Sequence, residues 1–428
     1  MITVIGTGTG APLPPDATAA VAGAALVVGA RRHLAAVSEA VPEGADRIVL
    51  GALAPALDTV EEYVGKERPV VVLASGDPGF FGIVRALAER FGAGRLDVRP
   101  GVSSVAAAFA RTGLTWDDAV VVSAHGRALR TAVNVCRARP KVAVLTGPGA
   151  GPAELGAALV GGPGARVLVV ASALGDPDLE RVERVTPAEA AARDWGDAVS
   201  VVLCLDEARA VASVPVTVAG AAAATGPARW ALDEREFTHR DSMITKFEVR
   251  ALALARLGPR LGDLVWDIGA GSGSVAVECA RLGAAVVAVE KTPDGADRVR
   301  ANAAAHGVDV RVVEGSAPDD LPALSAPGLE LDEPDAVFIG GGGRELPTIV
   351  AACAGRARRT VVVAMAALDR VPAVRAALVG AGLDCDGVLL QSSRLAPLPG
   401  EVTRLAATNP VFLLWGTRPS ARSEGVAL

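Results

Sequence analysis

The sequence is poor in aromatic residues and in lysine. Phe, Trp and Tyr make up 3% of its 428 residues, and the lysines are Lys66, Lys141, Lys246 and Lys291. The formal net charge of -6 at pH 7 leaves no basic excess, which argues against a nucleic acid as partner. With so few aromatic side chains, Ala, Val, Leu and Gly have to fill the interior, which favours close packing of helices on sheets.

Metal-binding cysteine pairs and long apolar segments are also missing. The cysteines are Cys136, Cys204, Cys279, Cys353 and Cys385. Their spacings do not match a zinc knuckle, so we expect free thiols and no metal site. The apolar stretch 17–30 is shorter than the roughly 18–20 residues of a membrane helix, and the first residues lack the basic region of a signal peptide. We therefore expect a cytoplasmic protein without a membrane partner.

Short β-branched runs alternate with Ala-rich helical segments along the whole chain. This alternation predicts an α/β fold with largely parallel sheets covered by helices. The uncharged stretch 215–227 is rich in Ala, Gly, Thr and Pro, which predicts a linker over residues 213–232. We therefore expect one domain in residues 1–212 and a second, doubly wound domain of seven strands in residues 233–428.

The expected strands can be given by residue range. In the first half they cover residues 2–5, 25–28, 47–50, 70–74, 119–123, 142–145, 167–171 and 200–205. In the second half they cover residues 264–268, 285–290, 309–313, 336–339, 360–364, 387–391 and 410–415. Helices are expected between them, for example at 82–91 and 103–111.

A glycine-rich segment, Asp267-Ile-Gly-Ala-Gly-Ser-Gly273, follows the first strand expected in the second half. Its glycines allow a ligand to lie on bare backbone, and a helix starting near Ser274 offers N–H donors to a carboxylate. Glu290 ends the next strand, where an acid can accept hydrogen bonds from both ribose hydroxyls. The pattern Asp-x-Gly-x-Gly-x-Gly is typical of S-adenosylmethionine (SAM) methyltransferases. A dinucleotide site, which needs Gly or Ala at Ser274, and a glycine turn without a ligand are the alternatives.

Glycine and serine loops also follow three strands of the first half. They are Gly6-Thr-Gly-Thr-Gly10, Ser75-Gly-Asp-Pro78 and Pro100-Gly-Val-Ser-Ser104. Loops at the carboxyl ends of parallel strands converge on the crevice where α/β sheets bind ligands, so we expect a second site there. The second Gly-Asp-Pro, at 175–177, is interpreted as a plain turn.

These motifs resemble those of two methyltransferase families. In the first half the Gly6–Gly10 loop, Ser75–Gly82, Pro100–Ser104 and Ser123–Arg127 are similar to tetrapyrrole methylases of the cobalt-precorrin-7 C5-methyltransferase type. In the second half the similarity is to the C15-methyltransferase/decarboxylase type. It is carried by Ile244–Arg250, Asp267–Ser274, Glu314–Pro318, Val337–Gly342 and Asn409–Leu413. In this order the two halves resemble the precorrin-6B (6Y) C5,15-methyltransferase (decarboxylating) family of cobalamin biosynthesis.

The resemblance implies a tetrapyrrole-methylase (class III) fold followed by a Rossmann-like (class I) SAM methyltransferase fold. It implies one SAM per domain, methylation of precorrin-6B at C5 and C15, and decarboxylation of the C12 acetate to give precorrin-8. The implied residues of the N-terminal SAM site are Gly8, Gly76, Asp77, Pro78, Ser103 and Ser104. Those of the C-terminal SAM site are Thr245, Asp267, Gly269, Ala270, Gly271, Ser272, Gly273, Glu290, Ser316 and Ala317. Since the C15 family is often tetrameric, we also expect a homo-oligomer.

The implied tetrapyrrole substrate carries several carboxylates. The candidates to contact it are His239, Lys246 and Arg344, with Arg240, Arg250 and Arg394 as further arginines. For each of these arginines the alternative is a solvated position on the surface. The chain departs from the family at 364–369, where it has Ala-Met-Ala-Ala-Leu-Asp instead of Asn-Ala-Val-Thr-Leu-Glu. An RNA methyltransferase, and a SAM-binding scaffold that has lost turnover in one half, are the competing hypotheses.

Overall fold

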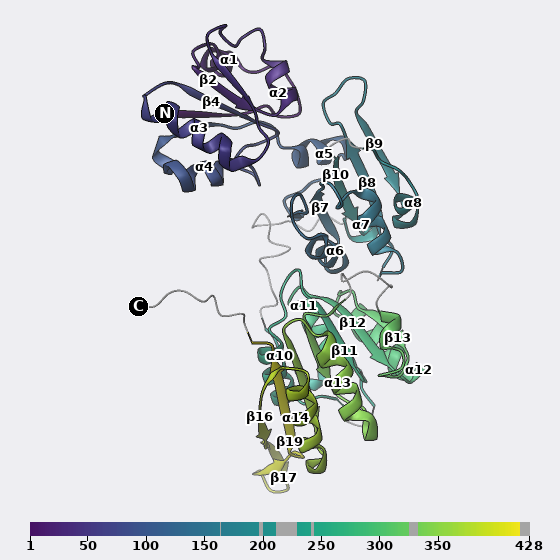
Figure 1. Ribbon diagram of the computed structural model, residues 1–428. Coiled ribbons are helices and arrows are strands. Elements are labelled where there is room, and N and C mark those ends of the chain that lie inside the picture. The colour runs from purple at the N-terminus through teal and green to yellow at the C-terminus, as the bar shows by residue number, and fades with distance from the viewer. Residues whose placement is uncertain (163, 197–199, 211–228, 241–243, 325–332, 420–428) are drawn as a thin grey trace.

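The computed structural model describes residues 1–162, 164–196, 200–210, 229–240, 244–324 and 333–419 (Figure 1). Most of the predicted linker lies outside these residues. Within them, no helix is long and apolar enough to cross a membrane. The described chain forms three main sheets, two in the first half and one in the second, with a small separate hairpin.

The first sheet is fully parallel, in the order β3-β2-β4-β1-β5. Its strands are β1 (Ile2–Gly6), β2 (Leu26–Gly29), β3 (Asp46–Val49), β4 (Val70–Ala74) and β5 (Leu96–Arg99). The helices are α1 (Pro15–Ala22), α2 (Arg31–Ala36), α3 (Leu53–Gly65) and α4 (Val84–Phe91). Hydrophobic clusters lie on both faces of the sheet, as its continuous β-branched strands require.

The second sheet corrects the expectation of parallel strands. Its strands are β6 (Val120–Ser123), β7 (Lys141–Leu145), β8 (Val167–Ser172), β9 (Arg181–Val185) and β10 (Ser200–Leu205), and the helices are α5 (Ser104–Thr112), α6 (Leu129–Ala138), α7 (Pro152–Leu159), α8 (Pro187–Ala191) and α9 (Glu207–Ala210). The order is β6-β7-β10-β8-β9, and only the β6–β7 pair is parallel. The sequence analysis missed β5 in the first sheet and β9 in the second, where the short connection to β8 permits an antiparallel pair.

The third sheet has the seven strands expected, in the order β13-β12-β11-β14-β15-β19-β16. They are β11 (Leu264–Ile268), β12 (Ala285–Glu290), β13 (Arg311–Glu314), β14 (Ala336–Ile339), β15 (Thr360–Met365), β16 (Asp384–Leu390) and β19 (Val411–Thr417). All pairs are parallel except those of β19. The helices are α10 (Phe247–Leu257), α11 (Ser274–Arg281), α12 (Pro293–Ala305), α13 (Leu346–Arg356) and α14 (Val371–Gly380).

The hairpin of β17 (Ser393–Leu398) and β18 (Val402–Ala407) was not predicted. The large apolar core of the third sheet lies between its strands and the helices on each face. Because β11, β12 and β14 are parallel, their carboxyl ends reach the same edge of the sheet. The predicted glycine loop and Glu290 therefore lie at one edge.

Candidate functional site

A cavity of about 720 Å³ opens at the carboxyl edge of the third sheet. This volume lies within the range of small-molecule sites. The glycine loop after β11 forms part of its wall, together with the chain before α10 and the segments that follow β14 and β15. The predicted residues that line it are Thr245, Lys246, Asp267, Gly269, Ala270, Gly271 and Ser272.

The three glycines of the loop have positive φ angles and different surroundings. A side chain at Gly269 would place Cβ 3.1 Å from the backbone nitrogen of Gly341, and at Gly273 it would lie 2.8 Å from Cγ1 of Val299. At Gly271, where φ is +58°, a Cβ would meet no atom within 4 Å. Gly269 and Gly273 therefore allow close packing of the protein itself, while Gly271 leaves open space beside the cavity.

Asp267 is buried at the end of β11, with 1% of its surface exposed. Its Oδ2 accepts a hydrogen bond from the Ala276 backbone N–H at 2.9 Å, whereas its buried Oδ1 has no hydrogen-bond partner among the described residues. Burial, with a smaller contribution from the charge of Glu290, raises the pKa of Asp267 to about 7. A buried polar atom without a partner is rare, so Asp267 is suited to a cationic or N–H group of a ligand.

Glu290 accepts a hydrogen bond from the backbone of the glycine loop. Its carboxylate accepts hydrogen bonds from the backbone N–H of Gly271 at 2.9 Å, and from the backbone N–H and hydroxyl of Thr292 at 3.1 and 2.9 Å. The side chain is 8% exposed and adjoins the cavity wall through Gly271. The predicted acid is therefore at the loop, with its two oxygens held in fixed directions.

Other predicted residues lie away from the cavity wall. The backbone N–H of Ser316 donates to Asp320 at 2.7 Å, and Ala317 packs into the core. His239 is half-buried and Arg344 is exposed, beside the lining residue Gly343. Among the predicted substrate contacts, the structure thus places Lys246 at the cavity.

Two candidate arginines have structural roles instead. Arg250 is fully buried and donates to the backbone oxygens of Thr245 and Leu232, so its expected contact with substrate is wrong. Arg394, on β17, makes paired hydrogen bonds of 2.8 to 3.1 Å with both Glu234 and Glu248. Its guanidinium therefore fastens the unpredicted hairpin to α10.

Several lining residues were not assigned to the site from the sequence. They include Phe338, Gly340, Met365, Ala366, Arg370 and Asn409. Phe338, Gly340 and Asn409 belong to segments that carried the family resemblance, so a signal for them was present. Arg370 had none beyond its place after a strand end, where loops form ligand sites in α/β sheets.

The three loops predicted in the first half do converge. Gly8 and Gly76 exchange backbone hydrogen bonds of 3.2 and 2.9 Å. A Cβ at Gly101 would lie 2.5 Å from the Gly76 oxygen, and one at Gly76 would lie 3.5 Å from Cα of Ser103 and from the backbone nitrogen of Ser104. The N-terminal candidate residues thus form one cluster at the carboxyl ends of β1, β4 and β5.

Single side chains brace this N-terminal cluster. Asp77 accepts the Gly79 backbone N–H at 2.7 Å, and Ser103 caps α5 by accepting the Ala106 backbone N–H at 3.1 Å. A Cβ at Gly6 would lie 2.8 Å from Cδ of Pro78, so the Gly-Asp-Pro turn packs directly on the first loop. These contacts fix the shape of the loops.

Two neighbours of this cluster were not foreseen. The ring of His33 lies 3.0 Å from the Ser75 hydroxyl, and burial, with the charge of Arg32, lowers its pKa to about 4. Gly175 forms a turn, as predicted, but a Cβ there would lie 1.8 Å from the backbone oxygen of Thr9. The second Gly-Asp-Pro therefore borders the first glycine loop.

The strand order of the third sheet, with its antiparallel β19 and its cavity at the glycine loop, defines the Rossmann-like class I methyltransferase fold. A family model for tetrapyrrole (corrin/porphyrin) methylases matches residues 1–191, and one for a precorrin methyltransferase domain matches residues 236–413. The predicted fold class, a tetrapyrrole-methylase fold followed by a class I fold, is thereby confirmed.

Similar proteins define the family. A precorrin-6Y C(5,15)-methyltransferase [decarboxylating] of a Sinorhizobium species is 38% identical over 351 residues, 80% of this chain and 79% of the relative. A protein of the same name from Mycobacterium tuberculosis is 33% identical over 340 residues, 77% of each chain. A cobalt-precorrin-7 C(5)-methyltransferase of Salmonella typhimurium is 33% identical over 174 residues, 40% of this chain and 83% of the relative. The chain belongs to the decarboxylating precorrin-6Y C(5,15)-methyltransferase family.

Proposed function

We propose that the N-terminal half methylates C5 of a precorrin-6B-type tetrapyrrole and that the C-terminal half methylates C15 and decarboxylates the C12 acetate, each half with its own SAM. The reaction as a whole follows from the family: the chain is a decarboxylating methyltransferase of cobalamin biosynthesis that uses SAM. The observation that carries the assignment of two sites is the presence of two separate glycine-loop clusters, one in each half. Boundaries at 212 and 233, self-association and a cytoplasmic location remain predictions.

The C-terminal cavity and the acid behind its glycine loop have the polar groups that SAM requires; Glu290 does not line the cavity itself but is bonded to the lining residue Gly271. The unpartnered Oδ1 of Asp267 fits the ammonium group, and the carboxylate of Glu290 fits the ribose hydroxyls. The open space at Gly271 leaves room for a ligand against the backbone. When bound, SAM supplies an electrophilic methyl group.

The protein's own contribution to methyl transfer is to hold the substrate in place and exclude water. A meso carbon of a tetrapyrrole is already nucleophilic, so orientation and desolvation can supply much of the acceleration. Phe338, Leu346 and Met365 give the cavity apolar walls, while Lys246 and Arg370 line it as cations. We assign these two cations to the carboxylates of the substrate.

Decarboxylation needs an electron sink for the pair of electrons from the broken carbon–carbon bond. The bond between the acetate methylene and its carboxyl carbon breaks, the electron pair passes into the conjugated macrocycle, and a proton takes the place of carbon dioxide. A general acid near the ring assists the last step. The end of β15 and the two residues after it line the cavity as Ala364-Met-Ala-Ala, so this wall offers apolar side chains where the family often has Asn and Thr.

The proposal is tested by counting SAM sites calorimetrically on the full chain and by mass spectrometry of the product formed from precorrin-6B. We expect two sites, and a product that has gained two methyl groups and lost one carbon dioxide. A single methylation with decarboxylation would restrict the chain to the C15 step. No SAM binding would contradict the assignment of both sites.

Glu290→Gln is expected to weaken SAM binding at the C-terminal site by about tenfold, because hydrogen bonds to a charged acceptor contribute about 1.5–3 kcal/mol and the amide replaces one acceptor by a donor. Calorimetry on the full chain measures this. Glu401→Gln, on the exposed β17–β18 turn, makes the same exchange away from the cavity and should bind as the native chain does. If both variants bound SAM with the same affinity, Glu290 would not be part of the C-terminal SAM site.

A further inference from the structure

A group of four charged residues joins the two halves at Asp309, just before β13. Nη2 of Arg166 lies 2.7 Å and Nη2 of Arg209 lies 2.5 Å from Oδ2 of Asp309. Asp206 accepts from the same two arginines at 3.1 and 2.6 Å, so two positive charges face two negative ones. The side chains of Arg166 and Asp309 are 4% and 15% exposed. Among the described residues, both ion-pair partners of Asp309 belong to the N-terminal half.

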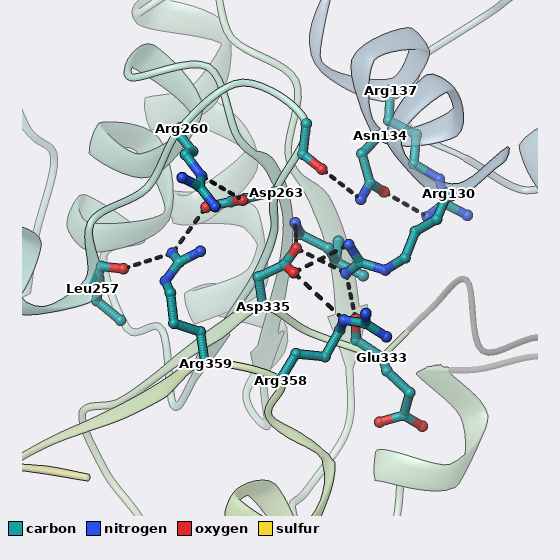
Figure 2. A network of polar contacts seen from close by, with 12 residues as sticks. Arg130, Asn134, Arg137, Leu257, Arg260, Asp263, Glu333, Asp335, Arg358 and Arg359 are labelled. Carbon is teal, nitrogen blue, oxygen red and sulfur yellow. Dashed lines mark hydrogen bonds and ion pairs between the residues drawn. The ribbon is translucent and has the colours of Figure 1, made fainter. Parts of the chain in front are cut away.

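A second group lies at Asp335, just before β14 (Figure 2). Arg130 of α6 places its two terminal nitrogens 3.1 and 2.8 Å from the carboxylate oxygens of Asp335, and also donates to the backbone oxygen of Glu333 at 2.5 Å. From the C-terminal half, Arg358 lies 3.8 Å from the same carboxylate, and the backbone N–H of Leu264 donates to it at 2.7 Å. The carboxylate of Asp335 is therefore oriented by contacts within its own half as well as by Arg130.

Neutral contacts complete the surface between these two groups. The amide of the fully buried Asn134 donates to the backbone oxygen of Gly262 at 3.1 Å, and Leu261 of the C-terminal half packs against the core beneath α6. Figure 2 shows Asn134 and Arg130 on the same helix, facing the C-terminal half. The contact thus includes a hydrophobic residue, a directional hydrogen bond and two ion-pair groups, as specific protein interfaces do.

The charges on the two sides are complementary. The N-terminal half contributes Arg130, Arg166 and Arg209 together with Asp206, and the C-terminal half contributes Asp309 and Asp335 together with Arg358, so positive charge predominates on the first side and negative charge on the second. Complementary charge selects a partner and fixes its orientation, whereas a buried charge left without its partner is strongly unfavourable. The geometry points to a specific docking interface: we propose that the face formed by α6, α9 and Arg166 binds the amino-terminal edge of the third sheet by itself, without the connecting residues 211–228.

The test uses the full chain with a protease site inserted within residues 211–228, cut after purification. We expect the two fragments to elute together in size-exclusion chromatography at micromolar concentration and about 0.15 M salt. Asp309→Asn should weaken their association at least about 30-fold, the lower end of the cost of removing one partner of a buried interfacial charge pair. Raising the salt concentration should weaken the native pair further through the exposed part of the ion pairs.

Asp297→Asn is the matched control, because Asp297 pairs with Arg300 within α12 and not across the interface. It should leave the association of the fragments unchanged. Native fragments that each stay folded by circular dichroism yet elute apart would overturn the proposal, and so would equal weakening by both variants.

A second measurement tests the proposal on the uncut chain, in case the fragments unfold after cleavage. Hydrogen exchange of the uncut chain should then show faster exchange in α6 for Asp309→Asn than for Asp297→Asn, with β11 unchanged. Identical exchange in α6 for the two variants would overturn the proposal.

Discussion

Gly271→Arg is expected to abolish SAM binding in the C-terminal half while the N-terminal site keeps its affinity. The substituted side chain starts in open space, so the protein itself does not have to move, but it extends into the volume that a ligand needs. We expect a loss of at least about 100-fold, or about 3 kcal/mol, at one of two sites. Calorimetric titration of the full chain would show two sites for the native protein and one for the variant.

The control for this change is Gly382→Arg. Gly382 also has a positive φ, of +77°, and also has no atom within 4 Å of its Cβ position, but it lies on the exposed connection between α14 and β16. It carries a similar backbone strain and the same added charge. If Gly382→Arg also lost SAM binding at the C-terminal site, the cause would be backbone strain and not an arginine side chain that fills the cavity. If Gly271→Arg kept both sites, the glycine loop would not be the SAM site.

Asp267→Asn is expected to make the C-terminal half more stable at pH 8 while weakening its SAM binding. The folded pKa of Asp267, about 7, lies above its ordinary value of 3.8. Between these values the folded state holds one proton more than the unfolded state, so stability falls as the pH rises through this window and levels off above it. Three pKa units correspond to a destabilisation on the order of 4 kcal/mol at pH 8, which the uncharged amide avoids.

Urea unfolding at pH 4.5 and pH 8, followed by tryptophan fluorescence to which the buried Trp266 contributes, measures this effect. The stability gained by Asp267→Asn over the native chain should be several-fold larger at pH 8. The exposed Asp384→Asn on β16 should show no such difference between the two pH values. A gain from Asp267→Asn that does not depend on pH would show that the carboxylate is already ionised in the folded state at low pH.

Much of the third sheet could be predicted because its strands are continuous apolar runs separated by turn residues. The predicted bounds of β11, β12 and β14 agree with the structure to the residue. The loops at their carboxyl ends followed from the rule that parallel strands bring their ends together. The cavity residues Asp267 and Gly271 were found in this way, from local sequence alone.

The features that were missed depend on contacts between distant segments. The β17–β18 hairpin contains charged and apolar residues without a clear alternation, and it is held by Arg394 reaching two glutamates far away in the chain. The burial of Arg250 depends on backbone oxygens of neighbouring turns rather than on its own helix pattern. Such pairings have no local signal, so the sequence indicated either a substrate contact or a solvated surface position for both arginines, and not the structural roles that they have.

The two halves meet at the edge of the third sheet that lies opposite the C-terminal cavity. Asp335 accepts a hydrogen bond from the first residue of β11, and the cavity wall begins at Asp267, the fourth residue of this five-residue strand. About 10 Å of strand therefore separates the interface from the first cavity-lining residue of β11. The opening of the C-terminal cavity therefore lies at the carboxyl edge of the sheet, away from the amino-terminal edge that meets the N-terminal half. Asp309 and Asp335 are not among the residues that line the cavity, so a substitution at the joint is expected to change how the halves associate without changing the wall of the C-terminal site.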